Sequence, residues 1–129
     1  MSFFNKLFGD SDKGSELPKV HWFYLEEMKE LDAIVEISFE KPVAIFKHST
    51  RCSVSRMVLK QFENELAIET SLMELYFLDL LAHREISNAI SQRFDVHHQS
   101  PQLIVIKDGN AIFNASHESI VAEDLKQFV

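Results

Sequence analysis

The chain of 129 residues has a single cysteine, Cys52, and therefore cannot form an intramolecular disulfide. Small secreted proteins that are held together by disulfides carry several cysteines, so that class of protein is excluded. An unpaired thiol is typical of a reducing compartment, and we expect a cytoplasmic protein.

Basic residues are also scarce. The sequence has 13 lysines and arginines against 20 aspartates and glutamates, which gives a net charge of -7. A protein that binds a nucleic-acid backbone needs a basic surface, so we expect no nucleic-acid partner. With only three glycines, the chain also offers no glycine-rich phosphate-binding loop.

Long hydrophobic runs are missing, and a membrane span of about 20 apolar residues is not expected. The N-terminal "MSFFNKLFGDSDKGSELPK" holds one short apolar cluster, which is followed by a polar, linker-like stretch from Gly9 to Lys19. We predict a flexible N-terminal arm over residues 1–19 and one domain over residues 20–129. A weak membrane-surface anchor is the alternative for the cluster. Its members are Phe3, Phe4, Leu7 and Phe8.

The spacing of apolar residues predicts nine elements along the domain. In chain order they are a strand in 20–24, a helix in 26–38, a strand in 43–46, a helix from Cys52 through Leu66, a strand within 72–81, a helix in 84–94, a strand in 102–106, a strand in 111–115 and a helix in 118–129. The first two helices carry Met28, Leu31, Ile34 and Val35, and Val54, Met57, Val58, Phe62 and Leu66; the last carries Ile120, Val121, Leu125 and Phe128.

Alternation of strands and helices predicts parallel strands joined by helical crossovers. The Asp108-Gly109 pair predicts a tight hairpin, which adds an antiparallel edge strand. The expected fold is therefore α/β, with a central mixed five-stranded sheet and helices on both faces.

Cys52 lies where the 43–46 strand leads into a helix, at the helix N-terminus. Unpaired backbone N–H groups and the positive end of the helix dipole favour the thiolate form. Lys47 and His48 are further candidates for stabilising the thiolate. The alternative is that a lone cysteine is a small buried apolar residue. His97 and His98 have no further ligands at diagnostic spacing, so we expect no metal site.

Two segments carry a resemblance. The order of elements, together with "HQSPQLIVIKDGNAIF", resembles the thioredoxin fold, in which a cis-proline precedes a strand facing the active cysteine; Pro101 matches that proline. More narrowly, "KPVAIFKHSTRCSVS" is similar to the monothiol bacilliredoxin family, the YtxJ-like proteins of the bacillithiol system, which carry an "FKHS-T-x-CPIS"-like signature. Here Ser53 replaces the proline of that signature, which adds one N–H donor near the sulfur.

The resemblance implies a monothiol thiol-disulfide oxidoreductase with Cys52 as its nucleophile. It implies a cis Ser100–Pro101 bond, a groove shaped by Pro101, and pairing of the substrate chain with the Ser100 backbone. The expected substrate-binding residues are Ser100, Pro101, Thr50, Arg51, Ser53 and Ser55.

The partners implied are S-thiolated proteins and a low-molecular-weight thiol, with bacillithiol suspected as co-substrate and no bound cofactor. Ser55 stands where a dithiol enzyme carries its second cysteine. A mixed disulfide on Cys52 must therefore be released by another small thiol or by a separate reductase.

Two other functions remain open. In "CSVS" a serine follows the cysteine by three positions, as in monothiol glutaredoxins that carry an iron–sulfur cluster between two protomers. Those proteins have Gly-Phe where this chain has Ser53-Val54. A non-catalytic thioredoxin-like binding module is the other alternative.

Overall fold

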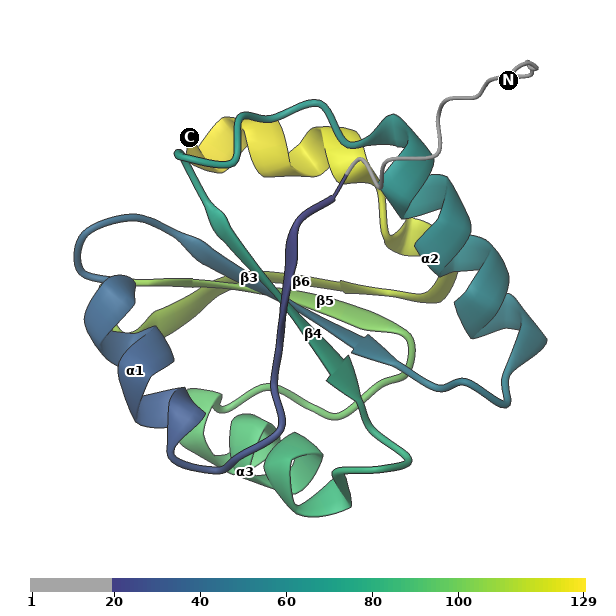
Figure 1. Ribbon diagram of the computed structural model, residues 1–129, viewed down its shortest axis with the longest axis horizontal. Helices are drawn as coiled ribbons and strands as arrows, with labels where there is room; N and C mark the ends of the chain where they lie inside the picture. Colours follow the sequence, from purple (N-terminus) through teal and green to yellow (C-terminus); the bar gives the residue numbers. More distant parts are fainter. Residues whose placement is uncertain (1–19) are drawn as a thin grey trace, which may run out of the picture.

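The computed structural model describes residues 20–129, and the predicted N-terminal arm lies outside the described residues. The fold is a five-stranded sheet with helices on both faces, as the sequence predicts (Figure 1). The strands are β2 (Trp22–Tyr24), β3 (Val43–His48), β4 (Glu74–Asp79), β5 (Gln102–Lys107) and β6 (Asn110–Ser116). The α-helices are α1 (Glu30–Ile37), α2 (Ser53–Glu65) and α3 (Arg84–Phe94), followed by the 3-10 helices η1 (His117–Ser119) and η2 (Ala122–Phe128).

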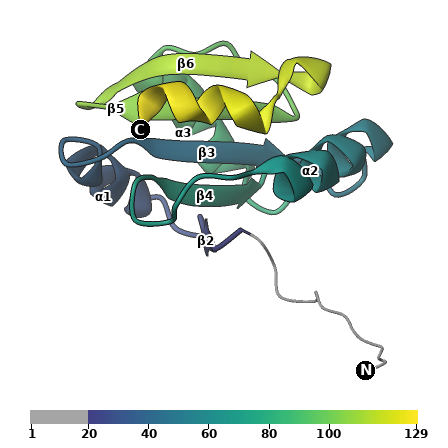
Figure 2. The same ribbon diagram turned by 90° about the horizontal axis from the view of Figure 1, so that it is seen from above.

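The strands lie in the order β2-β4-β3-β5-β6, which Figure 2 shows from above. β2 and β3 run parallel to β4, whereas β5 is antiparallel to β3 and β6 is antiparallel to β5. The mixed sheet is thereby confirmed. β3 lies in the middle and is buried along its whole length.

Each face of the sheet carries its own apolar core, because successive strand residues point to opposite faces. Val43 and Ile45 of β3 pack with α1 and α3, and Ala44 and Phe46 pack with α2 and η2. Figure 1 shows these two helical layers on opposite sides of the sheet. The C-terminal end of β3, which leads into α2, is therefore covered from both sides.

The single tryptophan links the edge strand β2 to α2. The Trp22 indole Nε1 donates a hydrogen bond of 2.7 Å to Glu63 Oε2. The ring is stacked on Phe62 at a centroid distance of 6.0 Å and meets Phe46 and Phe77 edge-on at 6.0 and 5.5 Å. This aromatic cluster fixes the inner face of α2 against the sheet.

The prediction of one helix over 118–129 is wrong. The segment forms two short 3-10 helices, because Ile120 and Val121 between them are extended. Leu125 is buried, but Val121 is 41% exposed. Met28 and Met57, which have helical spacing with the other apolar residues, are also exposed. α1 begins only at Glu30, and Met57 lies beside the buried stripe of α2.

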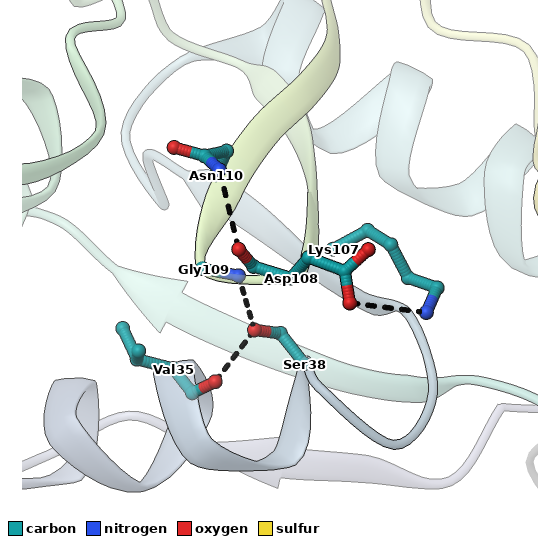
Figure 3. Close-up of polar contacts among 6 residues, drawn as sticks. All are labelled: Val35, Ser38, Lys107, Asp108, Gly109 and Asn110. Carbon is teal, nitrogen blue, oxygen red and sulfur yellow. Dashed lines mark hydrogen bonds and ion pairs between the residues drawn. The ribbon is translucent and has the colours of Figure 1, made fainter.

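The predicted hairpin is tied to the end of α1 by a buried serine (Figure 3). Ser38 Oγ donates to the Val35 carbonyl at 2.6 Å and accepts from the Gly109 N–H at 2.9 Å. Its carbonyl accepts from the Asp108 N–H at 2.8 Å. Gly109 has φ of 81°, a conformation that costs little only for glycine. The contact joins α1 to the β5–β6 turn.

Ser38→Ala is expected to lower the free energy of unfolding by about 1 kcal/mol, because the partly buried Gly109 N–H loses its acceptor. Denaturant unfolding measures this, with Ser119→Ala, a change at an exposed serine, as the control. Equal stability of the two variants would contradict a stabilising role for Ser38.

Candidate active site around Cys52

Cys52 is the N-cap residue of α2. Its backbone is extended, its carbonyl accepts the first helical hydrogen bond from the Arg56 N–H at 3.0 Å, and its N–H donates to the Ser49 carbonyl at 3.2 Å. The thiol is free and partly exposed. The first turn of α2 has no acidic residue, so its positive dipole end is not compensated from within the helix. The free thiol therefore lies at the uncompensated positive end of the helix.

Ser55 holds the Cys52 loop to the first turn of α2. Its Oγ accepts from the Ser49 N–H at 3.1 Å and shares a hydrogen bond of 2.8 Å with His48 Nδ1. The residue is completely buried, at 0% exposure. Ser55 was predicted to bind substrate; its side chain instead lies in the interior, where it positions the loop that carries the cysteine.

His48 lies beneath this loop and not at its surface. It is 4% exposed, and its ring packs on Phe77 at 5.4 Å. Burial lowers the pKa of His48, while Asp79 and Glu63 act in the opposite direction. A neutral His48 bonded to Ser55 supports the loop, and its side-chain hydrogen bond goes to Ser55 and not to the cysteine.

Lys47 points to the other face of the sheet. Neighbouring strand residues alternate, so Lys47 lies on the α1–α3 face with Val43 and Ile45, whereas His48 lies on the α2 face. The ammonium Nζ is 2.7 Å from His98 Nδ1, and the residue is 0% exposed. The side-chain hydrogen bonds of Lys47 and His48 thus go to His98 and Ser55, on opposite faces of the sheet.

The Ser100–Pro101 peptide bond is cis, which confirms the prediction. Pro101 is buried, and its carbonyl accepts from the His117 N–H at 3.1 Å. The register pairs Lys47 with Gln102, so Pro101 lies beside the end of β3 that leads to Cys52. Ser100 is only partly exposed, and its Oγ is buried without a partner.

Gln102 is a residue that the sequence interpretation missed. Its side chain is fully buried, its Nε2 donates to the His97 carbonyl at 2.9 Å, and its Oε1 accepts from the Gln99 N–H at 3.3 Å. These bonds fix the loop before Pro101. The sequence did indicate it, because Gln102 is a polar residue at the start of an otherwise apolar strand.

The remaining predicted residues surround the thiol at the surface. Thr50, Arg51 and Ser53 are exposed, and the Thr50 carbonyl accepts from the Arg56 guanidinium at 3.0 Å. Within residues 20–129, no group of three or more His, Cys, Asp or Glu side chains is arranged to hold a metal ion. The chemistry that the arrangement offers is that of one accessible thiol.

Lys47→Met is expected to remove a pH dependence of stability. Burial lowers the pKa of Lys47 from 10.5 to about 8, so between these values the unfolded chain binds the proton and the folded chain does not. The free energy of unfolding therefore rises with pH across this window in the wild type. Methionine carries no proton in either state, so the variant should lack this rise.

Denaturant unfolding from neutral pH to about pH 10 measures the effect as the difference between variant and wild type. Lys60→Met, at an exposed lysine, is the matched control. A pH slope in Lys47→Met equal to that of Lys60→Met would show that the buried amine does not titrate as described.

Comparison with known proteins agrees with this geometry. The family model described as monothiol bacilliredoxin BrxC matches residues 24–125. The chain belongs to the monothiol bacilliredoxin family. This bacilliredoxin has a thiol redox function and the fold of thioredoxin.

Among solved structures, one described as an oxidoreductase with a thioredoxin fold is 28% identical, with a TM-score of 0.69 over 81% of this chain and 90% of that one. The thioredoxin of Malassezia sympodialis is 15% identical, with a TM-score of 0.66 over 86% of this chain and 90% of that one. The thioredoxin of Trypanosoma brucei brucei is 14% identical, with a TM-score of 0.63 over 91% and 93%. The last two show likeness of fold alone.

For the bacilliredoxin domain described here, residues 20–129, no helix is both long enough and apolar enough to cross a membrane.

Proposed function

We propose that this bacilliredoxin removes a low-molecular-weight thiol from mixed disulfides on proteins. The observation that carries the proposal is the position of the single, partly exposed Cys52 at the N-terminus of α2. Cys52 follows the end of β3, and cis-Pro101 lies beside that end of the strand. The Cys52 thiolate attacks the sulfur of the small thiol. A bond forms between Cys52 and that sulfur, the mixed disulfide breaks, and the protein thiolate leaves with the electron pair.

The substrate groove involves the surface residues around the thiol. Thr50, Arg51 and Ser53 are exposed there, and the Ser100 backbone next to Pro101 pairs with an extended substrate segment. Such main-chain pairing tolerates different side chains, as a general dethiolating enzyme requires.

Turnover needs an external thiol. Ser55 supplies no electrons, so the small thiol on Cys52 leaves only when a second small thiol or a separate reductase attacks the new disulfide. The family membership supports bacillithiol as that small thiol. No bound cofactor is required for these steps, and a reducing cytoplasm is the compartment in which they operate.

Intact mass spectrometry tests the proposal. The protein is incubated with oxidised bacillithiol or with oxidised glutathione, and we expect one small-thiol adduct per chain, formed faster with bacillithiol. Cys52→Ala is the control and should remain unmodified. Failure of the wild type to form an adduct with either disulfide would contradict the proposal.

The iron–sulfur alternative is tested on the same protein. A cluster carrier that is purified without oxygen absorbs visible light through its cluster. We expect colourless protein, and a cluster that depends on Cys52 would replace the proposed function.

A further inference from the structure

Basic side chains gather beside the loop that precedes Pro101. Arg84 is the first residue of α3, and Lys47 is buried in β3. Burial lowers the pKa of His98, and Lys47, His97 and Arg84 lower it further. No carboxylate of residues 20–129 is within ion-pair distance of Arg84 or Lys47. In a chain with a net charge of -7, these two cations have no ion-pair partner among residues 20–129.

A cavity of about 70 Å³ opens at this cluster, lined by Leu80, Arg84, Ser87, Asn88 and His98. It offers a guanidinium, a hydroxyl, an amide and an imidazole. The cavity is small, and its volume suits a group of carboxylate size. The donors and the volume therefore fit one small anionic group.

Lys47 fixes the tautomer of His98, whose Nδ1 also lies 3.5 Å from the Ser87 Oγ. A protonated amine has hydrogens to donate and no lone pair to accept with, so at 2.7 Å it makes His98 Nδ1 the acceptor. The ring hydrogen of His98 is then on Nε2, on an exposed side chain. This leaves an N–H donor available to an anion, supported from behind by the buried charge.

The cavity is linked to the reactive region through the same short loop. His98 lies three residues before Pro101, and Gln102 fixes the backbone on both sides of His98 through the His97 carbonyl and the Gln99 N–H. A group held by His98 is thus held at a defined position relative to the proline.

We propose that this basic pocket, formed by Arg84, Ser87, Asn88 and His98, binds a carboxylate of the small thiol that Cys52 exchanges. The inference rests on the proposed function and deepens it, because it restricts the co-substrate to thiols that carry an acidic group. Charge-assisted hydrogen bonds to the guanidinium and imidazole supply the selectivity.

Paired small disulfides test the selectivity. The symmetric disulfides of mercaptoacetate, mercaptopropionate and mercaptohexanoate are compared with their neutral amides, and the rate of adduct formation on Cys52 is followed by mass. We expect the acid to react faster than its amide at the chain length that spans the distance to the pocket. In Arg84→Gln this preference should fall about tenfold.

Arg93→Gln is the matched control, because Arg93 lies on the same helix but is paired with Asp32 at 2.8 Å. It should keep the wild-type preference. An acid-to-amide ratio that never exceeds one in the wild type, or that survives in Arg84→Gln, overturns the proposal.

Titration with succinate measures anion binding to the pocket independently of thiol chemistry. In the Cys52→Ser protein, titration with succinate should shift the NMR signals of the His98 ring, and Arg84→Gln in the same background should remove the shift. If His98 does not respond, the pocket proposal fails even where Cys52 forms adducts. If succinate binds but no disulfide modifies Cys52, the proposed function fails and the anion site stands.

Discussion

Cys52→Ala is expected to reduce dethiolation of an S-thiolated test protein to the uncatalysed rate. The chain has no other thiol, and none of the groups around position 52 can accept a sulfur in exchange. The fold should be retained, because the residue is a partly exposed N-cap whose side chain caps nothing by hydrogen bonding. The measurement is release of the small thiol, with circular dichroism as a check on folding.

Ser55→Ala is the matched control for this change. It keeps the thiol but leaves the Ser49 N–H and His48 without their partner, so we expect a loss of stability of about 1–3 kcal/mol with most of the exchange activity retained. Full activity in Cys52→Ala would instead show that the thiol is not the catalyst, and a thioredoxin-like binding module would then be the better interpretation.

Ser55→Cys is expected to change the oxidised product of the enzyme. Positions 52 and 55 are the N-cap and third residue of α2, one helical turn apart, and this spacing lies in the Cα range of about 4.4–6.8 Å that a disulfide requires. The new thiol should attack the mixed disulfide on Cys52 and release the small thiol. Intact mass should then show an internal disulfide, two hydrogens lighter than the reduced chain, in place of the adduct.

Ser53→Cys supplies the control, since it adds a thiol next to Cys52 in sequence at an exposed position without the one-turn spacing. That variant should keep the small-thiol adduct. Persistence of the adduct in Ser55→Cys at the wild-type level would mean that the buried side chain at position 55 cannot reach the Cys52 sulfur.

Most of the elements could be predicted because the apolar pattern is local. The helix at residues 84–94 has the predicted bounds, and Ile86, Ile90 and Phe94 share its buried face. The closing segment could not be predicted in the same way. Its apolar residues have helical spacing, but whether Ile120 and Val121 extend or coil depends on packing against distant elements.

The position of Cys52 and the cis bond before Pro101 followed from the sequence, but the supporting contacts did not. Lys47 meets His98 across 51 positions of the chain, and no local pattern reports such a pair. The direction of Lys47 was accessible in principle, because strand residues alternate and His48 cannot share its face. The buried bonds of Ser55 depend on the loop conformation, which propensities do not determine.

The indole of Trp22 gives the protein an optical probe of the packing of α2. It is the only tryptophan, and it lies against Phe62 and is bonded to Glu63 on the helix whose first turn follows Cys52. Phe62 and Glu63 lie near the C-terminal end of α2, at the opposite end from Cys52. Intrinsic fluorescence therefore reports how this helix packs against the sheet, without an added dye.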